Sequence, residues 1–222
     1  MRKLLICVAM LLAAPLALAQ PAAFPSKPLR IYVPFNAGSG SDSASRAYGE
    51  ILAKLLGQPV VVENRPGGSG LLAINATRAA PPDGHTILLA SNSPMAVVPA
   101  LYAKPGYDAF KDLRPISGLT VGPAAFVVRA DSPFKSINDL FTTARAEKRP
   151  LTVGNYSEGY QLIAAWLGTS GSVPVTHVPY KGGAQMVTDI IGGQLDTGVN
   201  DFSGITPLLK EGRVRVLALT GD

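Results

Sequence analysis

Three short loops in this chain of 222 residues contain the residue types best suited to holding a small anion. They run from Asn36 to Asp42, from Ser91 to Ser93 and from Gly154 to Gly159, and each follows an expected strand. Glycine lets backbone N–H groups come close to a bound group, and the first and third loops lead into expected helices, whose N-termini attract negative charge. Together the loops predict a carboxylate cradle, although each loop alone also fits ordinary turn and capping chemistry.

A dinucleotide site is the rival interpretation of the first loop. Residues 38–43 (GSGSDS) nearly match the motif G-x-G-x-x-G, and Glu63 ends the next expected strand, where an acidic residue would bind ribose. However, Ser43 stands in place of the third glycine, and residues 36–37 lengthen the loop before the first one. We therefore expect no nucleotide and no other cofactor.

Catalytic and metal-binding patterns are weak in this sequence. After the first twenty residues the chain has two histidines, His85 at the start of one expected strand and His177 inside another. There is no G-x-S-x-G motif, and no group of histidines and acids has the spacing of metal ligands. We predict no catalytic residue and no metal, and keep as an alternative a secreted α/β enzyme that depends on His85 or His177.

The elements that position these loops follow an N-terminal leader. Two basic residues, Arg2 and Lys3, precede an apolar run from Leu4 to Leu18, and the run ends in the small-x-small sequence Ala17-Leu18-Ala19. This pattern is typical of a secretory signal peptide, and the run is shorter than the ~20 apolar residues that span a bilayer. We expect a signal peptide over residues 1–19 and a periplasmic location; a retained membrane anchor is the alternative.

Composition excludes several classes of protein. The only cysteine, Cys7, lies in the expected signal peptide, so the mature chain has no disulfide. The formal net charge of +5 is spread along the chain without a run of lysine and arginine, which argues against nucleic acid as a partner.

Strand and helix patterns alternate in two series, which is typical of parallel-rich α/β sheets covered by helices. An irregular stretch with extended segments near 116–119 and 124–128 separates the series, so we expect a first lobe over residues 20–123 and a second over 124–222. An expected strand at 214–219 so near the end of the chain suggests a fragment of a longer protein. The strands of the first series are expected at 29–35, 59–63 and 86–90, and its helices at 42–56 and 69–80.

Several motifs in order resemble one family, the extracytoplasmic receptors of the tripartite tricarboxylate transporter system, often called Bug proteins. The similarity spans about 28–222 and rests on VPFxxGxxxD at 33–42, VENRPGG at 62–68, PDGHT at 82–86, HVPYKG at 177–182 and GGQLD at 192–196. The resemblance implies a two-lobed periplasmic binding protein (type II-like) with a cleft between the lobes.

The resemblance also implies a function. Such a receptor would close on a small carboxylate and deliver it to membrane transporter subunits, acting as a monomer without catalysis. A ligand-sensing binding protein that acts through a sensor kinase is the other alternative. The two facing jaws would be residues 35–42 and 155–159, with further residues lining the cleft. The residues implied in ligand binding are Phe35, Gly38, Ser39, Ser41, Asp42, Ser91, Asn155, Tyr156, Ser157, Tyr180 and Asn200.

The sequence departs from the family pattern in the second jaw. Tyr156 adds bulk where small residues are common, and Glu158 adds a negative charge beside the expected anion site. Family members are also longer, with a C-terminal segment that returns to the first lobe, so we expect that lobe to be incomplete in this chain.

Overall fold

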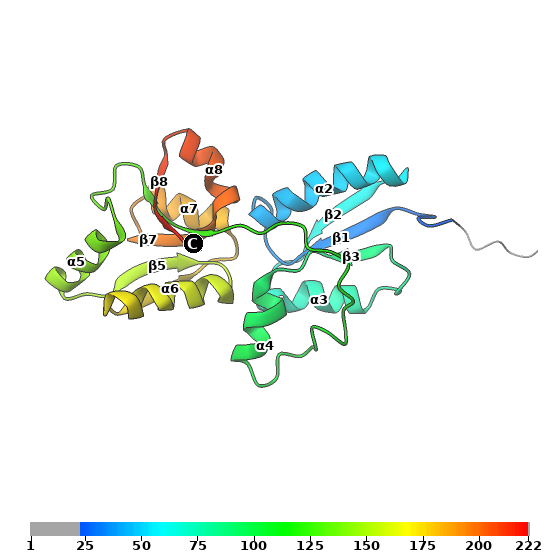
Figure 1. Ribbon diagram of the computed structural model, residues 1–222, viewed down its shortest axis with the longest axis horizontal. Helices are drawn as coiled ribbons and strands as arrows, with labels where there is room; N and C mark the ends of the chain where they lie inside the picture. The colour runs from blue at the N-terminus through cyan, green and yellow to red at the C-terminus, as the bar shows by residue number, and fades with distance from the viewer. Residues whose placement is uncertain (1–22, 222) are drawn as a thin grey trace, which may run out of the picture.

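The computed structural model describes residues 23–221, which form two α/β units side by side along the long axis of the molecule (Figure 1). The signal peptide expected at residues 1–19 lies outside this range. The strands are β1 (Leu29–Val33), β2 (Val60–Asn64), β3 (Thr86–Leu88), β4 (Ala124–Arg129), β5 (Leu151–Asn155), β6 (Val175–Pro179), β7 (Thr197–Asp201) and β8 (Val214–Leu219). The helices are α2 (Gly40–Leu56), α3 (Leu71–Arg78), α4 (Val98–Leu101), α5 (Ile137–Glu147), α6 (Glu158–Gly171), α7 (Gly183–Ile191) and α8 (Phe202–Lys210).

The first lobe is built on a three-stranded parallel sheet in the order β2-β1-β3. The central strand β1 is buried at four of its five residues, as its branched and aromatic sequence predicts. Helix α2 packs on β1 and β2, and α3 packs on β1 and β3. This is the β-α-β-α-β arrangement expected from the sequence, and it brings the loops after β1 and β3 to one edge of the sheet.

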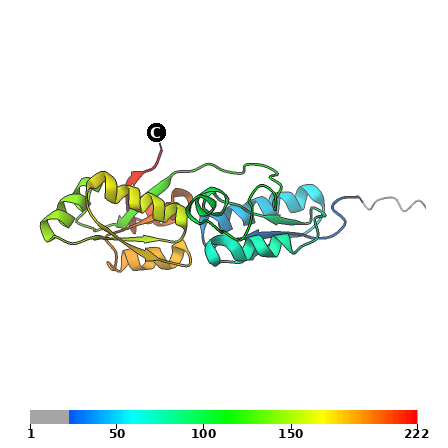
Figure 2. The same ribbon diagram turned by 90° about the horizontal axis from the view of Figure 1, so that it is seen from below.

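The second lobe contains a five-stranded sheet in the order β6-β5-β7-β4-β8. Strands β5, β6 and β7 are parallel, whereas β4 runs antiparallel to β7 and β8. Alternate residues of β4 belong to two different apolar clusters, Ala125 and Val127 to one and Ala124 and Phe126 to the other. Because successive side chains of a strand point to opposite faces, both faces of this sheet are covered. Figure 2 shows α6 and α7 on these two faces.

Two helix starts are set by local sequence. Ser136 caps α5 and forms a capping box with Asp139. The helix expected to begin at Ser69 begins instead at Leu71, after a turn of 3-10 helix, η1 (Gly68–Gly70). The three residues of that turn have positive φ, which the regular helix does not allow.

The crossing segment, residues 102–123, joins the two lobes along one side of the molecule (Figure 2). It contains no strand, so the extended segment expected at 116–119 does not pair with a sheet. Before it, a π-helical turn, η2 (Ser93–Val97), leads from the loop after β3 into α4. Across residues 23–221, no helix combines the length and the apolar character needed to cross a membrane.

Candidate functional site

The two lobes meet where their parallel strands end, and we call this contact region the seam. The loops after β1 and β3 come from the first lobe, and the starts of α6, α7 and α8 come from the second. Phe35 and Tyr156 pack edge to face across the seam, with ring centroids 6.0 Å apart. One apolar cluster therefore continues from β1 through these two rings into the second lobe.

The first loop is held in shape by its own polar side chains. Ser39 caps α2 by accepting the backbone N–H of Asp42, and both residues are buried. The Asp42 carboxylate accepts the Gly38 N–H at 3.0 Å and the Asn64 amide at 2.9 Å, and it pairs with Arg46. Burial favours a higher pKa for Asp42, but the hydrogen bonds from Arg46, Gly38 and Asn64 outweigh it and keep that pKa below its ordinary value. Asp42 thus shapes the loop as a carboxylate.

A side chain of the second lobe reaches the start of α2. Asp201, which caps α8 through the Gly204 N–H, accepts the Gly40 N–H through its other carboxylate oxygen, Oδ2, at 3.3 Å. The Tyr156 hydroxyl lies 2.7 Å from that same oxygen. The first N–H of α2, where the helix attracts negative charge, therefore meets a carboxylate of the facing lobe.

The third loop makes the matching contact in the opposite direction. Ser157 caps α6, and the N–H of Gly159 in the first turn donates to Ser93 Oγ of the first lobe at 3.3 Å. The Ser93 hydroxyl in turn donates to Glu158 at 3.2 Å, and Ser69 Oγ donates to the other oxygen of Glu158. The negative charge that Glu158 adds to this jaw is thus directed at two hydroxyls of the first lobe.

Tyr156 is the buried centre of the seam. Its hydroxyl lies 2.9 Å from Asn200 Oδ1 as well as 2.7 Å from Asp201. Burial, and then the neighbouring Tyr160 and the Asp201 carboxylate, raise the pKa of the Tyr156 phenol well above its ordinary value. The phenol therefore keeps its proton at neutral pH and can donate a hydrogen bond to a carboxylate.

Two predicted binding residues carry buried polar atoms that are unsatisfied among the described residues. They are Asn155 Nδ2, at the end of β5, and Ser91 Oγ, just after β3. A buried polar group without a hydrogen bond costs about 1–3 kcal/mol, so most such groups in proteins are paired. Both atoms belong to loops that the sequence assigns to ligand binding.

A cavity of ≈ 240 Å³ opens from the seam between α7 and α8. Gly38 of the first loop and Asn200 at the end of β7 line it, together with the start of α7, which has no side-chain cap. Unpaired N–H groups at a helix start and a neighbouring amide suit a carboxylate. The lining also includes three apolar side chains and one cation: Val187, Ile191, Leu208 and Arg213.

The other predicted residues lie less directly at the seam. The Tyr180 hydroxyl donates to Asp189 of α7 at 2.6 Å, and Ser41 accepts the Ser45 hydroxyl through its backbone oxygen. Asp201 and Ser69 are not among the predicted residues, although an aspartate directly before an apolar helix is a signal for an N-cap.

The structure places both histidines away from the seam contacts. His85 lies before the amino end of β3, where its Nε2 accepts the Ser26 N–H, and His177 lies in the middle of β6. Among residues 23–221 there is no group of three histidine, cysteine, aspartate or glutamate side chains that could hold a metal ion.

Two α/β lobes that meet at the carboxyl ends of their strands define the class of two-lobed periplasmic binding proteins. Residues 44–222 match the family described as the tripartite tricarboxylate transporter family receptor. The chain therefore belongs to this receptor family, as the sequence motifs indicate.

Known relatives support this assignment along the whole described chain. A UPF0065 protein of Bordetella bronchiseptica is 35% identical over 216 residues, which are 97% of this chain and 64% of the relative. Rpa4515 of R. palustris, solved with adipate, is 31% identical with a TM-score of 0.83, over 89% of this chain and 67% of that one. MatC of Rhodopseudomonas palustris, solved with bound malate, is 29% identical with a TM-score of 0.81, over 90% of this chain and 68% of that one. The chain thus spans about two thirds of the length of these relatives.

Proposed function

We propose that this chain is a periplasmic receptor that binds a small organic carboxylate between its lobes. The observation that carries the proposal is a pair of buried polar atoms, Asn155 Nδ2 and Ser91 Oγ, on facing loops of the two lobes, for which residues 23–221 supply no hydrogen-bond partner. The cavity lined by Gly38, Asn200 and the uncapped start of α7 supplies room and N–H groups for an anion. Adipate and malate in two structural relatives are acids of suitable size.

The mechanism follows from the two-lobed construction. A ligand that contacts both lobes favours the closed arrangement by the difference between its affinities for the closed and open states. Hinge motion would take place in the crossing segment, residues 102–123, which joins the lobes without pairing with either sheet. The closed surface would be what membrane transporter subunits recognise, with the receptor acting as a monomer.

Ligand binding is tested by thermal unfolding of residues 20–222 with mono-, di- and tricarboxylates. We expect at least one acid to raise the midpoint in a saturable way, because a ligand that binds the native state stabilises it. A cooperative transition that no acid shifts would contradict the proposal.

The variant Asn155→Leu tests whether the Asn155 amide binds the ligand. The Asn155 amide nitrogen has no partner among the described residues. An apolar side chain of similar size should therefore leave the unfolding free energy of the ligand-free protein within about 1 kcal/mol of the parent value. Affinity for the acid found in the thermal screen should fall about tenfold, equivalent to one lost hydrogen bond of about 1.4 kcal/mol. Asn138→Leu, at an exposed position of α5, is the matched control and should leave affinity unchanged.

A further inference from the structure

The start of α2 already holds a carboxylate of this chain. Asp201 Oδ2 accepts the Gly40 N–H across the seam, while Oδ1 accepts the Gly204 N–H at 2.6 Å and the Ser203 hydroxyl at 2.8 Å. The two carboxylate oxygens therefore differ in their contacts: Oδ1 caps α8 in the second lobe, and Oδ2 accepts a hydrogen bond from the first lobe. A Cβ added to Gly40 would collide with the Asp201 carboxylate, so glycine is what permits this approach.

A second carboxylate of the second lobe repeats the arrangement. Glu158 is held by hydroxyls of the first lobe, Ser93 at 3.2 Å and Ser69. Asp201 and Glu158 thus both present negative charge to first-lobe donors. Among the ion pairs of the described residues neither has a cationic partner, whereas Asp42 is paired with Arg46.

These contacts use the donors that a ligand carboxylate would need. The first-turn N–H of α2 is unsatisfied within its own helix and lies at the positive end of the helix dipole. Tyr156, which keeps its proton, donates to the same region of the seam. An external carboxylate held by the first lobe would therefore compete with Asp201 for the same positions.

We propose that Asp201 is a specificity-determining residue that occupies the carboxylate position of the first lobe and holds the lobes together without a ligand. An incoming carboxylate displaces it from α2 before binding. This inference rests on the proposed function where it concerns ligands, but not where it concerns the closure of the ligand-free protein.

Two consequences follow for ligand selection. When Asp201 occupies the position, a ligand can bind only those molecules in which the position is free. The apparent affinity is then the intrinsic affinity multiplied by the fraction of such molecules. The displaced carboxylate remains near the site, so a dicarboxylate experiences more repulsion than a monocarboxylate of the same length.

The variant Asp201→Asn isolates the cross-lobe contact from the capping role. Asparagine caps helices about as well as aspartate, so α8 keeps its cap when the amide oxygen faces Gly204. The amide NH2 group then faces the Gly40 N–H, two donors meet, and the cross-lobe bond is lost. Asp131→Asn is the matched control, because it removes the same charge from a second-lobe side chain that is 80% exposed.

The first measurement is small-angle X-ray scattering of the ligand-free proteins. We expect Asp201→Asn to have a larger radius of gyration than the parent chain, while Asp131→Asn matches the parent. Equal radii for all three proteins would overturn the role of Asp201 in closure.

The second measurement is calorimetric titration with butyrate and succinate. We expect Asp201→Asn to bind both acids about tenfold more tightly than the parent, with the larger gain for succinate. Unchanged affinities, or a gain shared by Asp131→Asn, would overturn the proposed competition. If neither acid bound either protein, the proposed function would fail for these acids, whereas the scattering result would still decide the role of Asp201.

Discussion

At the scale of single residues, close backbone approach determines how the lobes meet. Gly182, in the loop before α7, lies against Asn36 of the first loop, and a Cβ on Gly182 would stand 2.8 Å from the Asn36 Cβ. The backbone of Gly182 is extended, with φ of −179°, so any residue could adopt its conformation. Glycine is required here for space between the lobes.

We therefore predict that Gly182→Ala prevents full closure while both lobes stay folded. Relieving the overlap requires movement of the Asn36 backbone or of the lobes, at a cost of about 1–3 kcal/mol to the closed arrangement. Affinity for the carboxylate should fall about tenfold or more, measured by calorimetry, and the far-ultraviolet circular dichroism should not change.

Gly192→Ala, at the exposed end of α7 and outside the crossing segment, is the control for this substitution. The nearest atom to a Cβ at Gly192 would be the Thr188 backbone oxygen at 3.4 Å, and φ at this glycine is −72°. It should bind as the parent chain does, and equal affinity of both variants would contradict the steric role of Gly182.

Residue types predict the local part of the site better than its contacts between lobes. Ser39 and Ser157 stand before helices, and both are N-caps as such serines commonly are. The contact of Asp201 with Gly40 joins residues 161 positions apart, so it depends on the placement of two lobes that no local pattern encodes. The resemblance implies that Asp42 takes part in ligand binding, and its carboxylate also braces Gly38 and Asn64.

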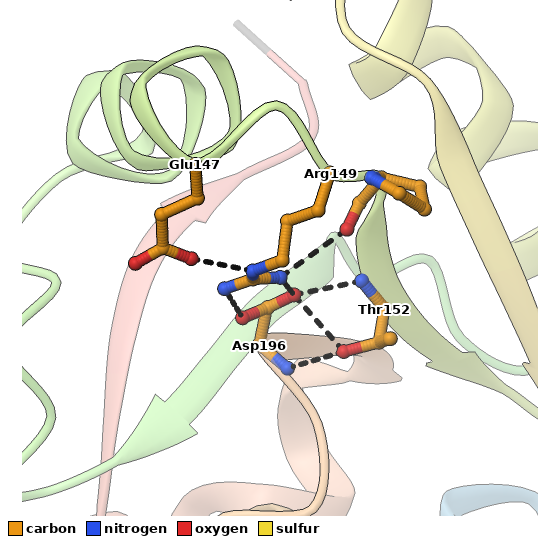
Figure 3. A network of polar contacts seen from close by, with 5 residues as sticks. Glu147, Arg149, Thr152 and Asp196 are labelled. Atoms are coloured by element: carbon orange, nitrogen blue, oxygen red, sulfur yellow. Dashed lines mark hydrogen bonds and ion pairs between the residues drawn. The ribbon is translucent and has the colours of Figure 1, made fainter.

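At the scale of elements, one ionic network fixes strands β5 and β7 in the second lobe (Figure 3). Arg149 pairs with both oxygens of Asp196, at 2.6 and 2.9 Å, and Glu147 at the end of α5 contacts Arg149 at 2.6 Å. Asp196 also accepts the N–H and hydroxyl of Thr152 in β5. The network thus ties the end of α5 to the starts of two neighbouring strands.

We predict that Asp196→Asn destabilises the second lobe by about 1–2 kcal/mol at pH 7. The Asp196 side chain is 10% exposed and that of Arg149 is 37% exposed, so solvent weakens the pair relative to a fully buried one. Burial acts to raise the pKa of Asp196, but hydrogen bonds from Arg149 and Thr152 outweigh it and lower that pKa below its ordinary value.

The pH dependence provides the check. Because the folded pKa lies below the unfolded one, the charge of Asp196 stabilises the fold above about pH 4 and loses this effect as the pH falls through the folded value. Urea unfolding at pH 7, 4 and 3 should show that the difference in unfolding free energy between the parent and Asp196→Asn becomes smaller on acidification. A difference that stays constant or increases would contradict the proposed contribution of the Asp196 charge.

The order of elements was predictable, but the direction of one strand was not. Apolar strands and capped helices are specified by residues close together in the sequence. The Ser136–Asp139 capping box, which sets the start of α5, is an example. Strand β4 has the apolar sequence of any buried strand, yet it runs antiparallel to β7 and β8. Its direction follows from where the crossing segment enters the sheet, which periodicity does not specify.

At the scale of the whole molecule, the two lobes differ in how much core they contain. The second lobe has five strands with apolar clusters on both faces. The first has three strands, and the outer edges of β2 and β3 pair with no strand in residues 23–221. Phe110, Ile116 and Val121 in the crossing segment are 78%, 79% and 104% exposed. Large exposed apolar side chains of this kind are available for contact with further polypeptide.

We propose that the first lobe, taken as residues 20–123, is completed by a further polypeptide segment that covers this surface. The curated relative from Bordetella bronchiseptica is matched over 64% of its length, so it has additional chain that could do so. Until covered, a three-stranded sheet buries less apolar area than a five-stranded one and gains less stability from it.

We predict that the first lobe opens more readily than the second when this chain is studied alone. In native-state hydrogen exchange, amides of β1 should exchange through an opening of lower free energy than amides of β5, by about 2 kcal/mol or more. Both strands are central and hydrogen-bonded on two sides, so the comparison reports the lobes and not the position within a sheet. Adding a carboxylate that bridges the lobes should reduce the difference, because unfolding of the first lobe would then release the ligand. Equal opening free energies without ligand would mean that the two sheets unfold as one unit, and that the first lobe is stable without a covering segment.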